Sequence, residues 1–223
     1  MRRITICHRS GSATIVAWMV YSAVLSAQEI ERPTWSLTDT WTYKVIDLNT
    51  YREGRGRFPS TRKVTITEVR GGRYWADVSI AKEYGERETK EEKWGISVNL
   101  NNYERDNATL PWTEMEFLRW PLAVGKSWTF SHPTSDGTRF EWHATVDRWE
   151  EVSVPAGRFK AIVVKIEGKG NTPYTAERTV WYAPEAKATV KVDWSGYWGM
   201  YELRGAIIEL TSFTINSAFP VPQ

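Results

Sequence analysis

The sequence predicts an all-β protein made of antiparallel sheets, and three observations support this prediction. Apolar and polar residues alternate with period two along most of the chain, as they do in strands that place one face on a core. Turn residues separate these runs, among them Gly71-Gly72, a pair that accepts the positive φ angles of a tight hairpin. Helical periodicity is nearly absent, and only residues 114–120 could form one or two helical turns.

The first 27 residues are expected to be a secretory signal peptide, which leaves residues 28–223 as a single antiparallel β domain. Three arginines precede an apolar run over residues 13–25, and Ser26-Ala27 then offers small residues for cleavage. This run is shorter than the roughly 20 residues that cross a bilayer, so we expect no transmembrane segment after cleavage, an uncleaved anchor being the alternative. Gln28 replaces the cysteine that would carry a lipid, which predicts no lipid anchor and a periplasmic or secreted protein.

Composition excludes several classes of function. The leader holds three of the 29 basic residues and none of the 27 acidic ones, so the mature chain carries a net charge of −1. A nearly neutral chain gives no reason to expect nucleic acid, whose binding depends on neutralised phosphates. The single cysteine, Cys7, lies in the leader, which excludes disulfides and cysteine nucleophiles from the mature protein.

The expected strands follow one another along the mature chain. Ala161 to Ile166 is a nearly continuous apolar run, and the last run, from Tyr201 to Ile215, could bend near Gly205. The other runs alternate, and each places its apolar residues on one face. The residues expected on these faces are Trp41, Tyr43 and Val45; Val64 and Ile66; Tyr74, Ala76, Val78 and Ile80; Trp94, Ile96 and Val98; Phe140, Trp142, Ala144 and Val146; Val180 and Tyr182; Val190 and Val192.

Similar blocks recur in the same order at an offset of 85 to 87 positions, which predicts a two-fold internal repeat. The halves would cover roughly residues 35–100 and 120–215. Each would supply about five strands, and the two sets would pack as a sandwich or join into a curved half-barrel. The matching positions are Trp41 and Trp128, Gly72 and Gly157, and Trp94 and Trp181.

Three motifs in the second half resemble those of a TapB-like family of exported bacterial proteins. They are the stretch from Pro121 to Phe130 (PLAVGKSWTF), Val154-Pro-Ala-Gly157 with Phe159 and Ala161, and Val180-Trp-Tyr-Ala-Pro184. The resemblance covers residues 120–215 well and the first half weakly. It implies an all-β envelope protein and supplies no catalytic residue. Glu185 to Ala188 stands where the family usually continues through a glycine, so the turn there is expected to differ.

The mature chain lacks the residue patterns of most catalytic sites. His132 and His143 are its only histidines, and their spacing suggests no metal site. No Gly-x-Ser-x-Gly elbow and no phosphate-binding loop occur, and we expect no cofactor. The acidic pairs Glu91-Glu92 and Glu150-Glu151 would point to opposite faces of a strand, which makes them poor catalytic dyads.

Aromatic residues are unusually frequent, with 13 tryptophans of which only Trp18 lies in the leader. Trp194, Tyr197, Trp198 and Tyr201 crowd around two glycines, and a glycine-rich loop would not bury four rings easily. These four residues could pack in the core or at its edge, or they could contact a ligand or partner.

We therefore expect an exported, non-enzymatic cell-envelope protein that binds an apolar ligand or a protein partner through a curved sheet. One alternative is a carbohydrate-binding module that uses Trp194 and Trp198, which requires exposed rings. The other is a hydrolase that uses scattered carboxylates, which requires a pocket gathering His143 with two of them.

Overall fold

The computed structural model describes residues 29–49, 56–83, 88–104, 113–134, 137, 139–170 and 172–216. The predicted signal peptide lies outside the described residues. Within them, nearly every element is a strand, and the helical content is one 3-10 turn, η1 (Pro184–Ala186). The all-β prediction is confirmed.

The strands form one ten-stranded antiparallel sheet and one two-stranded sheet. The order in the large sheet is β4-β3-β2-β1-β12-β11-β10-β9-β8-β7, and β5 pairs with β6. Their bounds are β1 Thr40–Asn49, β2 Gly56–Arg70, β3 Arg73–Lys82, β4 Thr89–Ser97, β5 Tyr103–Glu104, β6 Thr113–Glu114, β7 Ser127–Pro133, β8 Arg139–Val154, β9 Gly157–Lys169, β10 Tyr174–Ala183, β11 Ala188–Trp198 and β12 Tyr201–Thr214.

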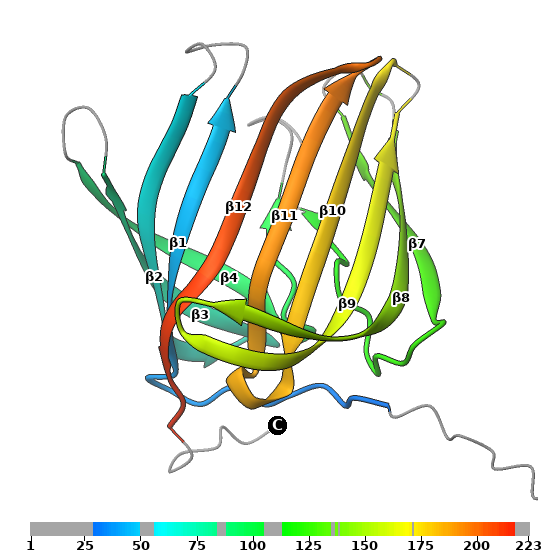
Figure 1. The fold of residues 1–223 in the computed structure, drawn as a ribbon. Helices are drawn as coiled ribbons and strands as arrows, with labels where there is room; N and C mark the ends of the chain where they lie inside the picture. The colour runs from blue at the N-terminus through cyan, green and yellow to red at the C-terminus, as the bar shows by residue number, and fades with distance from the viewer. Residues whose placement is uncertain are drawn as a thin grey trace, which may run out of the picture.

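The large sheet curls into an open half-barrel, with the segment that carries β5 and β6 inside the curve (Figure 1). It remains unclosed, because β4 and β7 are its edges. Register shifts in five of the strand pairs, such as the one between Val146 and Arg148, add local bends that help the sheet curl. The curved half-barrel is thus the arrangement found.

Each half of the chain contributes a four-stranded meander, β1–β4 and β7–β10, while β11 and β12 lie between them in the sheet. The turn at Gly71-Gly72 has φ angles of 61° and 69°, as predicted for a hairpin that requires positive φ at both positions. Gly157 likewise has a φ of 137° after the Pro155-Ala156 turn. The two-fold repeat stays a prediction.

One end of the half-barrel is closed by two segments that cross it. Residues 29–39 run beneath the strand ends, and the tip of the β8–β9 hairpin crosses β10 and β11 to reach β12 (Figure 1). There the Ala156 amide donates to the Leu210 carbonyl at 2.9 Å. The Trp41 indole donates at 2.8 Å to the carbonyl of Ala186, the last residue of η1. The Trp35 indole donates at 2.8 Å to the carbonyl of the next residue, Lys187.

Buried apolar side chains form two clusters. The first gathers the closed end, including Trp41, the inward faces of β2 and β3, and the β8–β9 tip. The second gathers the inward faces of β7 to β10 with Leu118 and Leu122. Strand β9 contributes residues to both clusters, since Ala161 belongs to the first and Ile162 to the second.

Some local expectations need correction. Residues 56–61 belong to β2, although glycine and proline among charged residues over positions 51–61 are typical of an exposed loop. Residues 115–120 are irregular rather than helical, and the Leu118 amide and the Glu116 carbonyl bond to the distant side chains of Asn101 and Trp128. Val98 lies in a turn after β4. In the turn after Pro184, Lys187 adopts a left-handed φ of 50°, the conformation that a glycine takes most readily.

Candidate functional site

A cavity of about 270 Å³ lies between the concave face of the sheet and the segment that follows β4. The sheet contributes inward residues from β1, β2, β4, β10, β11 and β12. The segment contributes residues between Leu100 and Leu118, so the cavity has one wall of strands and one irregular wall. The aromatic lining residues are Trp35, Trp41, Tyr43, Trp94, Phe117, Tyr182 and Trp194.

The aromatic end of the cavity is held by ring contacts and hydrogen bonds. The ring centroids of Trp35 and Trp41 lie 4.7 Å apart, and that of Tyr74 lies 5.3 Å from Trp35. Aromatic pairs at such distances stabilise beyond their buried area. Because both indole N–H groups already bond to carbonyls near η1, these rings present carbon surface to the cavity.

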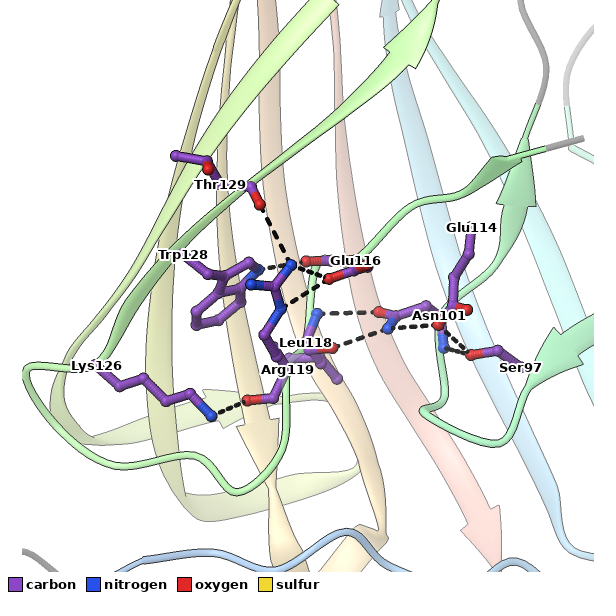
Figure 2. Close-up of polar contacts among 9 residues, drawn as sticks. All are labelled: Ser97, Asn101, Glu114, Glu116, Leu118, Arg119, Lys126, Trp128 and Thr129. Atoms are coloured by element: carbon purple, nitrogen blue, oxygen red, sulfur yellow. Dashed lines mark hydrogen bonds and ion pairs between the residues drawn. The ribbon is translucent and has the colours of Figure 1, made fainter.

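The irregular wall is fixed by the buried side chain of Asn101 (Figure 2). Its amide accepts from the Leu118 amide at 2.9 Å and donates to the Leu118 carbonyl at 2.8 Å. Ser97 donates at 2.7 Å to Glu114, which also accepts from Asn101 at 3.2 Å. These bonds join two stretches of the segment that strand pairing alone would leave apart.

The far end of the same wall is attached to the start of β7 (Figure 2). The Trp128 indole donates to the Glu116 carbonyl at 2.7 Å, and Arg119 forms an ion pair with the Glu116 carboxylate. Lys126 donates to the carbonyls of Arg119 and Pro121, both at 2.7 Å. Desolvation lowers the pKa of Lys126. The charge of Arg119 lowers it further, and that of Glu29 raises it. The wall is therefore anchored to both edges of the open sheet.

The charged residues among the described lining of this cavity are all basic: Arg62, Arg178 and Lys191. Lys191 pairs with Glu209 at 3.4 Å and lies 5.5 Å from the Trp181 ring. The guanidinium of Arg178 lies 3.9 Å from the Phe117 ring centroid, and that of Arg62 lies 5.0 Å from the Trp94 ring. The cavity is therefore mostly apolar, with basic side chains as the charged part of its described lining.

Burial changes the proton affinity of several lining groups. Desolvation raises the pKa of Tyr43 and of Tyr182, so both phenols stay protonated across the physiological range. Desolvation also lowers the pKa of Arg62, an effect opposed by the charges of Asp47, Tyr43 and Glu92. The Tyr182 hydroxyl is buried and has no hydrogen-bond partner among the described residues.

The structure separates the four aromatic residues predicted as a ligand or partner contact. Trp194 lies in register with Arg178 and Ala206, and all three line the cavity. Tyr197 is half-buried and is not among the lining residues. The side chains of Trp198 and Tyr201 lie outside the described part of the structure, although their backbones pair across the β11–β12 turn.

The interpretation of residues 194–201 as a glycine-rich loop is wrong, because residues 194–198 complete β11. Gly196 is buried in that strand, and a Cβ there would lie 2.4 Å from the Tyr174 hydroxyl. Any side chain at this position would force the Tyr174 ring to shift, so glycine permits the close approach of a ring from the neighbouring strand. The glycine accommodates an aromatic side chain in the fold instead of opening a loop.

A second hollow, at β7–β10, gathers His143 with Glu141, Glu167 and Glu177. This is the combination of residues that the hydrolase alternative requires. All four side chains are exposed, and the hydrogen bond of His143 is to the Thr145 hydroxyl at 3.3 Å. A catalytic base also needs a third group that orients it. Among the described residues, His143 contacts the Thr145 hydroxyl but forms no hydrogen bond to any of the three glutamates, so this hollow supplies the residue types of the hydrolase alternative without an oriented base.

Among the described residues, no group of three His, Cys, Asp or Glu side chains is arranged to hold a metal ion. In the same part of the chain, no helix has the length and apolar character needed to cross a membrane.

Sequence reasoning missed the arginines of the cavity. A signal for them existed, because Arg62 continues the inward series of Val64 and Ile66, and Arg178 continues that of Val180 and Tyr182. A charged residue at an inward position of an alternating strand indicates either a structural ion pair or a binding site.

Comparison with known proteins gives distant structural similarities. No family model and no curated protein matches the chain. A solved structure from Bacteroides fragilis NCTC 9343, described as a candidate exported protein with a YmcC-like fold, is 15% identical with a TM-score of 0.46, over 83% of this chain and 99% of its own. A candidate lipoprotein from Parabacteroides distasonis ATCC 8503 is 12% identical with a TM-score of 0.43, over the same shares. The TapB-like resemblance stays a prediction.

Proposed function

We propose that this protein is an exported, non-enzymatic binding protein of the cell envelope that holds an apolar ligand in the cavity of its half-barrel. The cavity of about 270 Å³, lined by aromatic and aliphatic side chains, carries the proposal. Small-molecule sites are concave and mostly apolar, with a few placed polar groups, which is the composition of this lining.

The size of the cavity limits the ligand. An apolar cavity of about 150 Å³ holds a molecule such as benzene, so about 270 Å³ suits roughly ten to twelve non-hydrogen atoms. Such a ligand would contact the strand wall near Trp41 and the irregular wall near Leu118. Because Asn101 already fixes the irregular wall, little side-chain ordering would be needed on binding, and affinity would benefit.

The other two functions have less support. A sugar-binding platform needs exposed rings, whereas Trp194 contributes to the lining of the cavity. In the hollow around His143, no described carboxylate forms a hydrogen bond to the imidazole that would orient it as a base. A protein partner remains the alternative occupant of the concave face, and the binding experiment below separates the two.

The test is a fluorescence titration with 1-naphthylamine, a neutral apolar probe whose roughly 11 non-hydrogen atoms match the volume of the cavity. We expect saturable binding to the wild-type protein. Ala206 lines the cavity, so Ala206→Trp should fill it and weaken binding at least about tenfold. Ile207→Trp is the matched control, because the next residue of β12 points to the opposite face.

Thermal unfolding of each variant guards against misfolding, since overpacking costs about 1–3 kcal/mol. If Ala206→Trp unfolds, the smaller Ala206→Leu replaces it. Absence of saturable probe binding to the folded wild-type protein, or equal loss in Ala206→Trp and Ile207→Trp, would refute an apolar-ligand cavity and leave the partner protein as the occupant of the concave face.

A further inference from the structure

The charge of the cavity lining is one-sided. Three basic side chains contribute to it, and its described lining residues include no acidic side chain. An aliphatic or aromatic ligand without charge would gain nothing from this arrangement, since a buried cation costs free energy unless an anion or hydrogen-bond acceptors pair with it. A ligand that carries an anionic group would gain from any of these cations that keeps free donors.

Arg62 is the available cation. Its Nε is buried and makes no hydrogen bond to any described residue, and among these residues its guanidinium forms no ion pair. The nearest acidic groups are committed elsewhere or open to water. Glu92 bonds to Lys90 at 2.5 Å and to the Trp94 indole at 2.7 Å, and Asp47 is exposed.

The surroundings hold Arg62 in place without satisfying its donors. Its guanidinium lies 5.0 Å from the centroid of the Trp94 ring, a cation–π distance that fixes position but uses no N–H group. The residue is paired in register with Tyr43 on β1 and Ile80 on β3, so the strand backbone is rigid on both sides. A fixed guanidinium with free N–H donors matches the two oxygens of a carboxylate or the oxygens of a phosphate.

We propose that the ligand of this cavity is a single-chain amphiphile with an anionic head group, which Arg62 binds, while its apolar tail packs against the aromatic end near Trp35 and Trp41. This inference rests on the proposed function, because it names the chemistry of the ligand in the same cavity. The volume admits one short chain and excludes a two-chain lipid. Arg178, across the cavity on β10, adds positive potential on the same face.

The experiment measures displacement of 1-naphthylamine by three single-chain ligands of about eleven or twelve non-hydrogen atoms, each below its micellar concentration. Decanoate and heptyl phosphate carry the anionic head, and decanol is the neutral counterpart. With the wild-type protein, we expect both anions to bind at least about tenfold more tightly than decanol. The two anionic arms distinguish a carboxylate from a phosphate head.

Substitution of Arg62 tests the anchor. Arg62→Gln should weaken decanoate binding about ten- to a hundredfold and change decanol binding by about twofold or less. Arg62→Lys should recover part of the decanoate affinity, because it keeps the positive charge but not the paired N–H donors of the guanidinium. Lys63→Gln is the matched control: it removes the same charge from the next residue of β2, whose side chain is exposed, and should change neither affinity.

The outcomes separate this inference from the proposed function. If the probe binds and decanol competes as well as decanoate, the cavity stands and the anionic head group is refuted. The head group is likewise refuted if Arg62→Gln and Lys63→Gln weaken decanoate binding equally. If the neutral probe itself fails to bind, the proposed function is the part that fails. Should Arg62→Gln unfold, Arg62→Met, which keeps the apolar length of the side chain, takes its place.

Discussion

The two walls of the cavity are held by different kinds of interaction. The strand wall is a continuous ladder of backbone hydrogen bonds from β4 to β7, so its side chains contribute packing. The irregular wall is held by side chains that bond to backbone groups, above all Asn101 and Lys126. A substitution should therefore remove packing from the first wall and connections from the second.

The largest expected effect is on the strand wall. Trp41 is 1% exposed and its indole donates to the Ala186 carbonyl at 2.8 Å, so Trp41→Ala should destabilise the fold by about 3–5 kcal/mol. Urea unfolding measures this change. Lys44→Ala, on the exposed face of the same strand, is the control and should cost no more than about 0.5 kcal/mol. Similar losses in both variants would contradict the assignment of Trp41 to the wall.

A smaller effect of a different kind is expected on the irregular wall. Asn101→Ala leaves the buried amide and carbonyl of Leu118 without their partners, which should cost about 2–3 kcal/mol. Hydrogen exchange should locate the change, with faster exchange at Leu118 than at the amides of β1. Asn99→Ala is the control, since the exposed Asn99 uses its backbone carbonyl to accept from Trp120. Unchanged exchange at Leu118 would show that another contact holds this wall.

The smallest effect is expected at Lys126. Lys126→Met removes two hydrogen bonds to carbonyls but keeps the apolar stem, so a loss of about 1 kcal/mol is expected by thermal unfolding. The exposed Lys63→Met should be neutral. A loss as large as that of Trp41→Ala would mean that the two walls unfold as one unit.

The strand wall could be predicted from the sequence, whereas the irregular wall could not. In strand β3, the buried residues Tyr74, Ala76 and Val78 alternate with exposed or half-buried ones, and the period-two pattern identifies it. Strand β9 buries every residue from Ala161 to Val164, because its two faces belong to different clusters, and its continuous apolar run indicates this burial. Hydrophobic periodicity in the sequence reflects which residues of a single strand are buried, and it therefore predicts the strand wall of the cavity.

The bonds of the irregular wall leave no periodic trace. Asn101 meets Leu118 because the chain turns back on itself, and no spacing rule connects an asparagine with a backbone group 17 positions away. The candidate site is only partly predictable for a related reason. Aromatic crowding indicates Trp194, whereas Arg62 is easily assigned to a polar surface unless it is recognised as an interruption in the inward series of its strand.

The position of β12 has a consequence for how the chain reaches its native state. The last strand pairs with the first, Thr40 opposite Thr214, and thereby joins the two meanders. Contacts between such distant positions close large loops, and proteins rich in them fold slowly. Until the C-terminal end of the chain is available, the N-terminal meander would keep the β1 edge unpaired. A folding intermediate of this kind exposes a strand edge that can pair with another chain.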